Sequence, residues 1–199
     1  RLKKEAGISA VDLVHPGMVL GLGTGSTAKY ALAEIALRLR DGRLSDIAGI
    51  PSSLETERTA RELGIPVISF DDKQEIDLTI DGADEVDPGL NLIKGGGGAL
   101  LREKVLAQSS RRNVMIVDES KLSPMLGTHC PVPVEVIPFA WKPVANYLRS
   151  LGGEPVLRLN EDGAPYATDQ NNYIIDCRFG PIPDLGDLAV KLGQKAGIA

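Results

Sequence analysis

Residues 18–40 read MVLGLGTGSTAKYALAEIALRLR, and this stretch decides the fold. The apolar run 18–22 predicts a short strand, and residues 28–40 predict a helix. A glycine-rich loop joins the two. A strand, a tight loop and a helix in this order are typical of α/β proteins, in which parallel strands alternate with covering helices.

The same alternation continues on both sides of this unit. A first helix is expected over residues 2–15, where Pro16-Gly17 ends it. Further strands and helices are expected in turn at 47–50, 52–64, 67–70, 76–80, 99–107 and 113–117. Residues 1–127 are therefore predicted to form a Rossmann-like parallel sheet flanked by helices.

The pattern changes near residue 127, where several prolines interrupt the chain. A strand, a helix, two strands and a helix are expected at 132–137, 140–151, 154–159, 173–178 and 184–196. This β-α-β-β-α order is a split βαβ pattern. Residues 128–199 are therefore predicted to form a smaller ferredoxin-like α+β domain that lacks its last strand and the return to the main sheet.

Composition excludes several classes of protein. The net charge of −5 argues against nucleic acid as a partner, because binding to the phosphate backbone requires a basic face. No apolar run approaches the roughly 18 residues of a membrane span, so no membrane association is expected. Cys130 and Cys177 do not have a metal-ligand spacing. Two free thiols suit a reducing compartment, and a cytoplasmic location is expected.

Residues that carry chemistry are densest at 76–106, IDLTIDGADEVDPGLNLIKGGGGALLREKVL. Asp81 comes where the strand at 76–80 should end, and ligands of open α/β sheets bind outside the carboxyl ends of strands. Gly95–Gly98 precede a helix, where backbone N–H groups approach a ligand closely and attract anions. The stretch therefore predicts a catalytic site for a small phosphorylated or polyhydroxylated molecule.

A purely structural interpretation of these residues stays open. Asp-Gly and Asp-Pro pairs are common in turns, and acidic residues often cap helices, so Asp81 or Asp84 taken alone fits a structural role equally well. Glu103 lies in the charged run Arg102-Glu103-Lys104, and taken alone it reads as a solvated helix carboxylate.

The glycine loop at 21–27, GLGTGST, matches neither common nucleotide-binding motif. Ser26 stands where the dinucleotide pattern G-x-G-x-x-G needs its last glycine, and no Gly-Lys-Ser/Thr follows. Hydroxyl groups and N–H groups at a helix N-terminus suit one phosphate monoester. The alternative is a simple helix cap by Ser26 or Thr27.

Taken together, the motifs of this chain resemble those of the A-type ribose-5-phosphate isomerases. The resemblance rests on GLGTGSTA at 21–28, DGADE at 81–85, KGGGGALLREK at 94–104, DESK at 118–121 and VPVEVIPFAW at 132–141. It runs from about Leu2 to the end of the chain. No single block is specific, but their combination and order are.

The resemblance implies interconversion of ribose 5-phosphate and ribulose 5-phosphate in the non-oxidative pentose phosphate pathway, with neither a metal nor an organic cofactor. It also implies a homodimer or a larger homo-oligomer. The general base of the family corresponds to Glu103. The substrate-binding positions correspond to Thr24, Gly25, Ser26, Thr27, Asp81, Gly82, Ala83, Asp84, Lys94, Gly95, Gly96, Gly97 and Lys121. Lys3 corresponds loosely to a lysine that helps hold the phosphate.

The residues suit this chemistry. One carboxylate, Glu103, can move a proton between C1 and C2. The oxyanion that develops needs positive charge, which Lys94, Lys121 and the N–H groups of Gly95–Gly98 can supply. Asp81 is the candidate for opening the sugar ring.

The two ends of the substrate are expected at different motifs. Asp84 is the candidate for binding the sugar hydroxyls, together with Asp81 and Lys94. The phosphate is expected at the 24–27 loop, because carboxylates beside it would repel it.

Two alternatives remain at the level of sequence. A non-catalytic sugar-phosphate sensor would keep the phosphate loop without needing Glu103. An amino-sugar deaminase would need a catalytic histidine, and neither His15 nor His129 lies within the motifs. The family resemblance also implies a few dozen further residues after Ala199. We therefore expect an exposed strand edge in the smaller domain.

Overall fold

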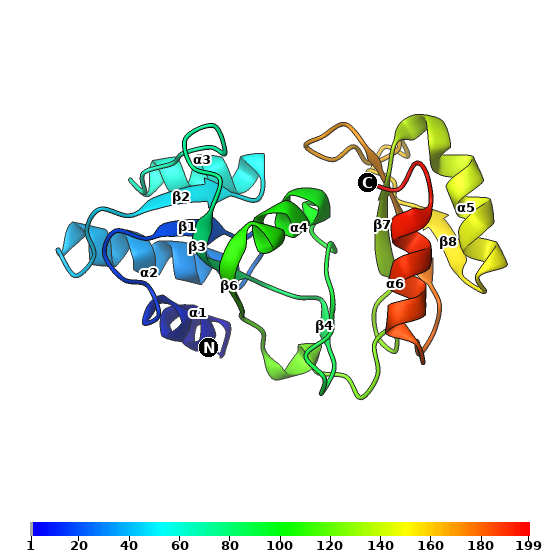
Figure 1. Cartoon of the computed structure of the whole chain (residues 1–199), viewed down its shortest axis with the longest axis horizontal. Helices are drawn as coiled ribbons and strands as arrows, with labels where there is room; N and C mark the ends of the chain where they lie inside the picture. Colours follow the sequence, from blue (N-terminus) through cyan, green and yellow to red (C-terminus); the bar gives the residue numbers. More distant parts are fainter. Residues whose placement is uncertain (1) are drawn as a thin grey trace. The chain divides into compact units, whose positions relative to one another are not determined.

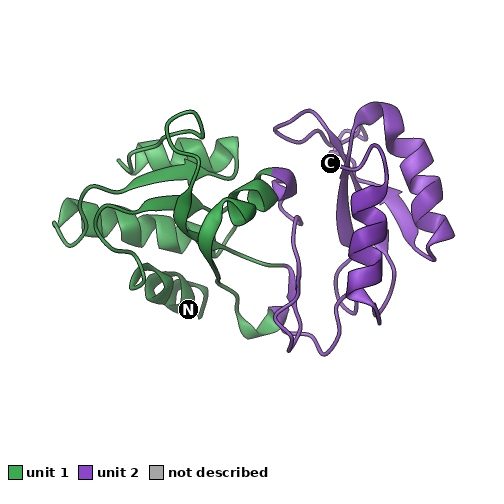
Figure 2. Cartoon of the chain, in the orientation of Figure 1, with its two compact units in different colours: residues 1–83, 102–120 green, residues 84–101, 121–199 purple. Residues whose placement is uncertain are grey.

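The computed structural model describes residues 2–199, which form two compact units (Figure 2). The first unit comprises the chain up to Ala83 together with Arg102–Ser120, and the second comprises Asp84–Leu101 and Lys121–Ala199. The chain therefore passes from the first unit to the second and back before the final crossing. The predicted domains, 1–127 and 128–199, stay a prediction.

The first unit is built around a parallel sheet in the order β2-β1-β3-β6 (Figure 1). Its strands are β1 (Val19–Leu22), β2 (Ala48–Pro51), β3 (Ile76–Asp81) and β6 (Ser110–Met115). Its helices are α1 (Leu2–Val11), α2 (Ala28–Arg40) and α3 (Leu54–Glu62), joined by α4 (Leu100–Gln108), which begins two residues before the unit boundary. The predicted Rossmann-like sheet with covering helices is confirmed.

Apolar side chains at helical and strand spacing explain how these elements pack. Ala31, Leu32 and Ile35 of α2 are buried against Leu20 and Leu22 of β1 in the main core cluster. Leu106 of α4 packs in a separate cluster with Ile50 and Ile76. Because all four strands are parallel, their carboxyl ends meet at one edge of the sheet. The loops after Leu22, Pro51 and Asp81 therefore start from the same edge.

The strand predicted at 67–70 is wrong. Val67 forms only an isolated bridge with Gly49, which donates to Pro66 O and accepts from Ile68 N. The chain then turns, because the Asp72 carboxylate accepts hydrogen bonds from Ser69 N and Ser69 Oγ. This local turn ends the pairing after a single bridge.

The second unit contains a hairpin and a small antiparallel sheet. The hairpin, β4 (Glu85–Val86) with β5 (Leu92–Ile93), was not expected from sequence. The sheet, in the order β7-β9-β8, consists of β7 (Val132–Val136), β8 (Glu154–Leu157) and β9 (Tyr173–Arg178), with helices α5 (Trp141–Ser150) and α6 (Leu185–Gln194). Two short 3₁₀ turns, η1 (Glu119–Lys121) and η2 (Pro138–Ala140), complete the chain. The expected smaller α+β arrangement is confirmed.

One face of this small sheet is covered and forms a core. Val134, Val136, Ile175 and Cys177 pack against buried residues of α5. After α6, Ile198 forms an antiparallel bridge with Val136, and Ala199 N donates to Glu135 O at 3.0 Å. These contacts cover part of the β7 edge, whereas the sequence predicts one exposed strand edge in this domain without specifying the strand.

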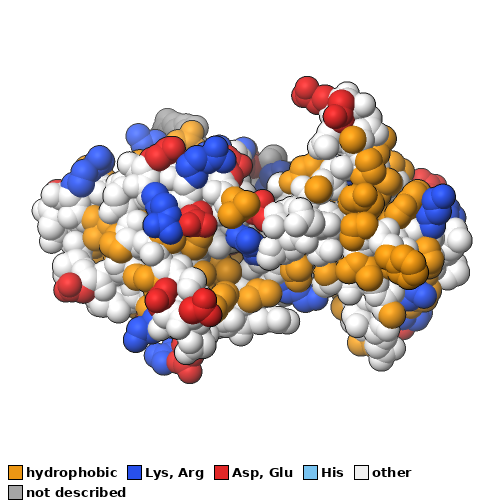
Figure 3. All heavy atoms as spheres, turned by 90° about the horizontal axis from the view of Figure 1, so that it is seen from above, with side chains coloured by type: hydrophobic (Ala, Val, Ile, Leu, Met, Phe, Trp, Pro, Cys, Tyr) orange, Lys and Arg blue, Asp and Glu red, His pale blue; other side chains and the backbone are white. Residues whose placement is uncertain are grey.

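The surface of the first unit carries charges of both signs. On the face shown in Figure 3, Lys and Arg side chains are interspersed with Asp and Glu side chains, and no continuous basic face is seen there. Among residues 2–199, no helix is both long and apolar enough to cross a membrane.

Candidate active site

The predicted phosphate loop begins against the end of β3. Gly23 N donates to Ile80 O at 3.0 Å. A Cβ atom at Gly23 would lie 2.6 Å from the Asp81 Cα, closer than real side chains approach a backbone atom. Only glycine fits here, so the sequence GLG at 21–23 lets the loop pass directly over Asp81.

The end of the loop forms the start of α2. Thr27 occupies the N-cap position without a side-chain capping hydrogen bond, so the alternative of a simple cap by Thr27 is wrong. The exposed Ser26 Oγ accepts a hydrogen bond from Lys3 Nζ at 3.0 Å, and Lys3 also lies 4.0 Å from the Asp118 carboxylate. A lysine, a serine hydroxyl and a helix N-terminus thus lie together, which favours binding of an anion.

Thr24 lies among hydroxyl groups that the sequence analysis missed. Its Oγ1 is within 2.7–2.9 Å of the hydroxyl oxygens of Ser52, Ser53 and Thr56. These three side chains are buried and follow β2, the neighbour of β1. The signal available in the sequence was the run Ser52-Ser53 directly after a predicted strand.

The two candidate catalytic carboxylates of the first unit are both buried. Asp81 is the last residue of β3, is 2% exposed, and accepts a hydrogen bond from Gly82 N at 2.8 Å. Glu103 lies in the first turn of α4 and is 5% exposed. The interpretation of Glu103 as a solvated helix carboxylate is therefore wrong. A buried carboxylate in a helix is costly unless it has a function or a partner.

In the second unit, the glycine run is held by Asp84. The Asp84 Oδ2 atom accepts a hydrogen bond from Gly96 N at 2.7 Å, and Gly98 N donates to Gly95 O at 3.0 Å. Two of the N–H groups expected to bind an anion, those of Gly96 and Gly98, are therefore used in hydrogen bonds that hold the loop. Gly95 and Gly98 have positive φ angles of 102° and 84°, which explains the need for glycine.

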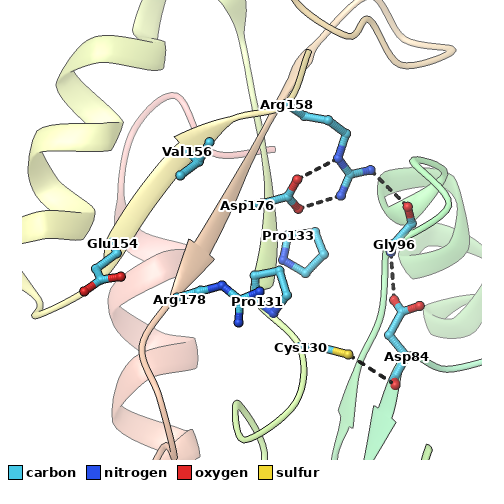
Figure 4. A pocket seen from close by; sticks show the side chains of 10 residues that line it. All are labelled: Asp84, Gly96, Cys130, Pro131, Pro133, Glu154, Val156, Arg158, Asp176 and Arg178. Carbon is cyan, nitrogen blue, oxygen red and sulfur yellow. Dashed lines mark hydrogen bonds and ion pairs between the residues drawn. The ribbon is translucent and has the colours of Figure 1, made fainter. Parts of the chain in front are cut away.

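An arginine holds the other side of the glycine run, and the sequence analysis missed it. Arg158 forms a two-point ion pair with Asp176, at 2.6 and 2.8 Å, and donates to the carbonyl oxygen of Gly96 (Figure 4). It also donates to the carbonyl oxygen of Gly95. A planar guanidinium suits this arrangement because it donates in several fixed directions. The signal was weak, because Arg158 lies 63 and 62 residues after Gly95 and Gly96, in a different predicted domain.

These groups line a cavity of about 660 Å³ on the open face of the small sheet. Figure 4 shows Asp84 and Gly96 on one side and Arg158, Asp176 and Arg178 on the other. Cys130 Sγ contacts the Asp84 carbonyl oxygen at 3.6 Å. Of the remaining predicted site residues of this unit, Lys94 follows β5, Gly97 lies in the glycine run, and Lys121 ends η1.

No group of three or more His, Cys, Asp and Glu side chains in the described part of the chain, residues 2–199, has the arrangement of a metal site.

Glu85, next to Asp84, fixes the start of the hairpin. Its carboxylate is 1% exposed and accepts hydrogen bonds from the backbone N–H groups of Gly127, Thr128, His129 and Cys130 at 3.0–3.4 Å. Burial acts to raise the pKa of Glu85, but hydrogen bonds from Ser123 and from this backbone outweigh it, so the pKa lies below its ordinary value of 4.5.

Replacing Glu85 by Gln is expected to lower the free energy of unfolding by about 2–3 kcal/mol at pH 7, because an amide offers N–H groups to N–H donors. A carboxyl whose pKa is lowered by folding stabilises the protein above its unfolded pKa, and this stability is lost as pH falls through the folded pKa. The difference between wild type and variant in urea unfolding should therefore shrink below about pH 4. Glu161→Gln, in an exposed turn, is the control. A difference that stays constant with pH would contradict the assignment.

Comparison with known proteins identifies the family of this chain. The family model of ribose 5-phosphate isomerase A (phosphoriboisomerase A) matches residues 48–199. Ribose-5-phosphate isomerase A of Chloroflexus aurantiacus is 56% identical over 196 residues, which cover 98% of this chain and 82% of the relative. A D-ribose-5-phosphate isomerase solved in complex with phospho-erythronic acid superposes with a TM-score of 0.97 at 41% identity, covering 100% of this chain and 87% of that one. The ribose 5-phosphate isomerase of Plasmodium falciparum superposes with a TM-score of 0.95 at 42% identity, covering 100% and 88%. This chain belongs to the ribose-5-phosphate isomerase A family.

Proposed function

We propose that this chain is an aldose–ketose isomerase that interconverts D-ribose 5-phosphate and D-ribulose 5-phosphate in the non-oxidative pentose phosphate pathway. The observation that carries the proposal is the buried carboxylate of Glu103, in the first turn of the helix that follows the glycine run. Family membership supplies the substrate. A non-catalytic sensor is not favoured, because a sensor has no use for a buried carboxylate at this position.

Glu103 is assigned as the acid/base group. In the open-chain aldose it takes the proton from C2, and the electrons of that bond form the C1–C2 double bond while negative charge moves onto O1. Return of the same proton to C1, with transfer of the O2 hydrogen to O1, gives the ketose. A single positioned carboxylate suffices for both carbon steps.

The developing negative charge on oxygen requires positive charge nearby, and Lys94 and Lys121 are assigned to supply it. Asp81, buried at the end of β3, is assigned to move the proton that opens the sugar ring. Asp84 is assigned to the sugar hydroxyls. Because one of its oxygens already accepts from Gly96 N, its orientation is fixed.

The phosphate group is assigned to the 24–27 loop. Support comes from Lys3, whose ammonium group lies 3.0 Å from Ser26 Oγ at the start of α2. A dianionic phosphate gains from the positive end of the helix and from this lysine together. The carboxylates assigned to the sugar would repel it.

Catalysis is proposed to need neither a metal nor an organic cofactor, since proton transfer by carboxylates does not require one. The chain is also proposed to act in the cytoplasm as a homodimer or a larger homo-oligomer. Sedimentation equilibrium measures the oligomer directly, and a monomer at assay concentration would contradict that part.

The decisive assay follows conversion of ribose 5-phosphate to ribulose 5-phosphate with and without a chelator. Equal rates in both conditions are expected. Absence of any conversion by the folded protein would sink the isomerase assignment. Loss of activity on chelation, restored by a divalent metal, would instead overturn only the cofactor-free mechanism.

A further inference from the structure

We infer that Ser52, Ser53 and Thr56 are positioning residues for the phosphate loop, and that Thr24 acts through them rather than by donating a hydrogen bond to the phosphate. The inference deepens the proposed function and rests on it. It leaves Ser26, Thr27 and Lys3 as the side chains that meet the phosphate.

The four hydroxyl groups form one compact cluster. Thr24 Oγ1 lies 2.7 Å from Ser52 Oγ, 2.8 Å from Ser53 Oγ and 2.9 Å from Thr56 Oγ1. Ser53 Oγ donates to Thr56 Oγ1 at 3.1 Å. Thr56 Oγ1 donates in turn to the carbonyl oxygen of Gly23 at 3.2 Å.

Counting hydrogens decides the direction of these bonds. Each hydroxyl group has one hydrogen to donate. Thr56 uses its hydrogen on Gly23 O, and Ser53 uses its hydrogen on Thr56. Thr24 donates to Ser53, which leaves Ser52 as the donor to Thr24. With these four hydrogens placed, the 2.9 Å contact between Thr24 and Thr56 contains no hydrogen. The Thr24 hydrogen therefore stays inside the cluster and is not available to a phosphate oxygen.

Burial makes the hydrogen bonds of the cluster costly to break. Ser52, Ser53 and Thr56 are 0%, 6% and 4% exposed, so each lost partner would leave a buried polar group unsatisfied. Ser26, by contrast, is exposed. The hydroxyl groups of the loop thus divide into an inward member, Thr24, and outward members at the start of α2.

The cluster also connects backbone from two neighbouring strands. Ser52 N donates to Leu22 O at 2.9 Å, at the end of β1. Ser53 caps α3 by accepting from Thr56 N at 3.0 Å. Because Thr56 then donates to Gly23 O, the helix start, the end of β2 and the phosphate loop are held in one network. A loop held this way presents its N–H groups in a fixed geometry.

Thr56→Val removes the hydroxyl group without changing the shape of the side chain, and Thr56→Ser keeps it as the matched control. We expect Thr56→Val to raise both KM for ribose 5-phosphate and Kd for inorganic phosphate by about fivefold to twentyfold, with kcat within about threefold of wild type. Thr56→Ser should restore both constants. Ser52→Ala, a milder change, should likewise raise KM and Kd while leaving kcat nearly unchanged. It replaces Thr56→Val in the test if that variant does not fold.

Two results would overturn the inference. A lower melting temperature with unchanged KM and Kd would mean that the cluster is only structural. A raised Kd in Thr24→Val, with none in Thr56→Val or Ser52→Ala, would mean that Thr24 donates to phosphate itself. Since phosphate binding is measured without turnover, the outcome stays separate from a failure of the wild type to isomerise the sugar.

Discussion

Replacing Glu103 by Gln is expected to lower kcat by about 10²–10⁴-fold while changing KM by less than about threefold. The amide has the shape of the carboxylate but cannot accept a proton from carbon. Because Gln keeps the size of this buried side chain and can still form hydrogen bonds, we expect the variant to fold. Loss of turnover with retained stability would separate catalysis from folding.

The measurement is steady-state isomerisation together with a thermal melt of the same preparation. Glu62→Gln, the same change at an exposed position at the end of α3, is the control and should leave both quantities unchanged. A fall in kcat of less than about tenfold in Glu103→Gln would mean that another residue is the base.

Local sequence was sufficient for most of the fold. The helix α2 spans Ala28–Arg40 as expected, and β3 ends at Asp81 as expected. Both are bounded by strong signals, a glycine loop in one case and an Asp-Gly pair in the other. The strand prediction at 67–70 was wrong because an apolar pattern does not show which strand, if any, the segment pairs with. The Asp72 carboxylate accepts a hydrogen bond from Ser69 N, and the resulting turn directs the backbone away from the sheet.

The site was harder to predict where residues act through partners distant in the chain. The motif at 81–103 could be recognised from the sequence, but the distant residues that hold it in place could not. Arg158, the residue after β8, hydrogen-bonds to the glycine run, and Ser52, the residue after β2, hydrogen-bonds to Thr24. Nothing in the residue itself separates such an arginine or serine from an ordinary surface residue. Only the pairing of strands brings them to their partners.

Glu103 shows the reverse case, in which structure corrected the local interpretation. The run Arg102-Glu103-Lys104 looks like a solvated helix face, yet the middle residue is buried. Three consecutive charges on a helix point in different directions, about 100° apart, so their burial can differ completely. Glu103 and Leu106, the buried residues of α4, are three positions apart and therefore lie on the same face of the helix.

A second large effect is expected from adding one methyl group to the phosphate loop. In Gly23→Ala the new Cβ would lie 2.6 Å from the Asp81 Cα and would also meet the carboxylate of that residue. A backbone atom of a central strand cannot move away cheaply, so either the loop or Asp81 must shift. We expect the free energy of unfolding to fall by about 1–3 kcal/mol. We expect kcat/KM for ribose 5-phosphate to fall by about 100-fold or more, because displacements near 1 Å carry penalties of this size.

Gly193→Ala is the matched control for this variant. Gly193 lies in α6, and a Cβ there would have no atom within 4 Å. The same substitution should leave the kinetics unchanged and add about 0.5–1 kcal/mol of stability, because alanine favours the helix. Denaturant unfolding and steady-state kinetics of the two variants give the comparison. If Gly23→Ala retained wild-type kcat/KM, the close approach of the loop to Asp81 would not matter for the reaction. The assignment of Asp81 to ring opening would then have to be given up, because a carboxylate that tolerates such a displacement is not positioned for proton transfer.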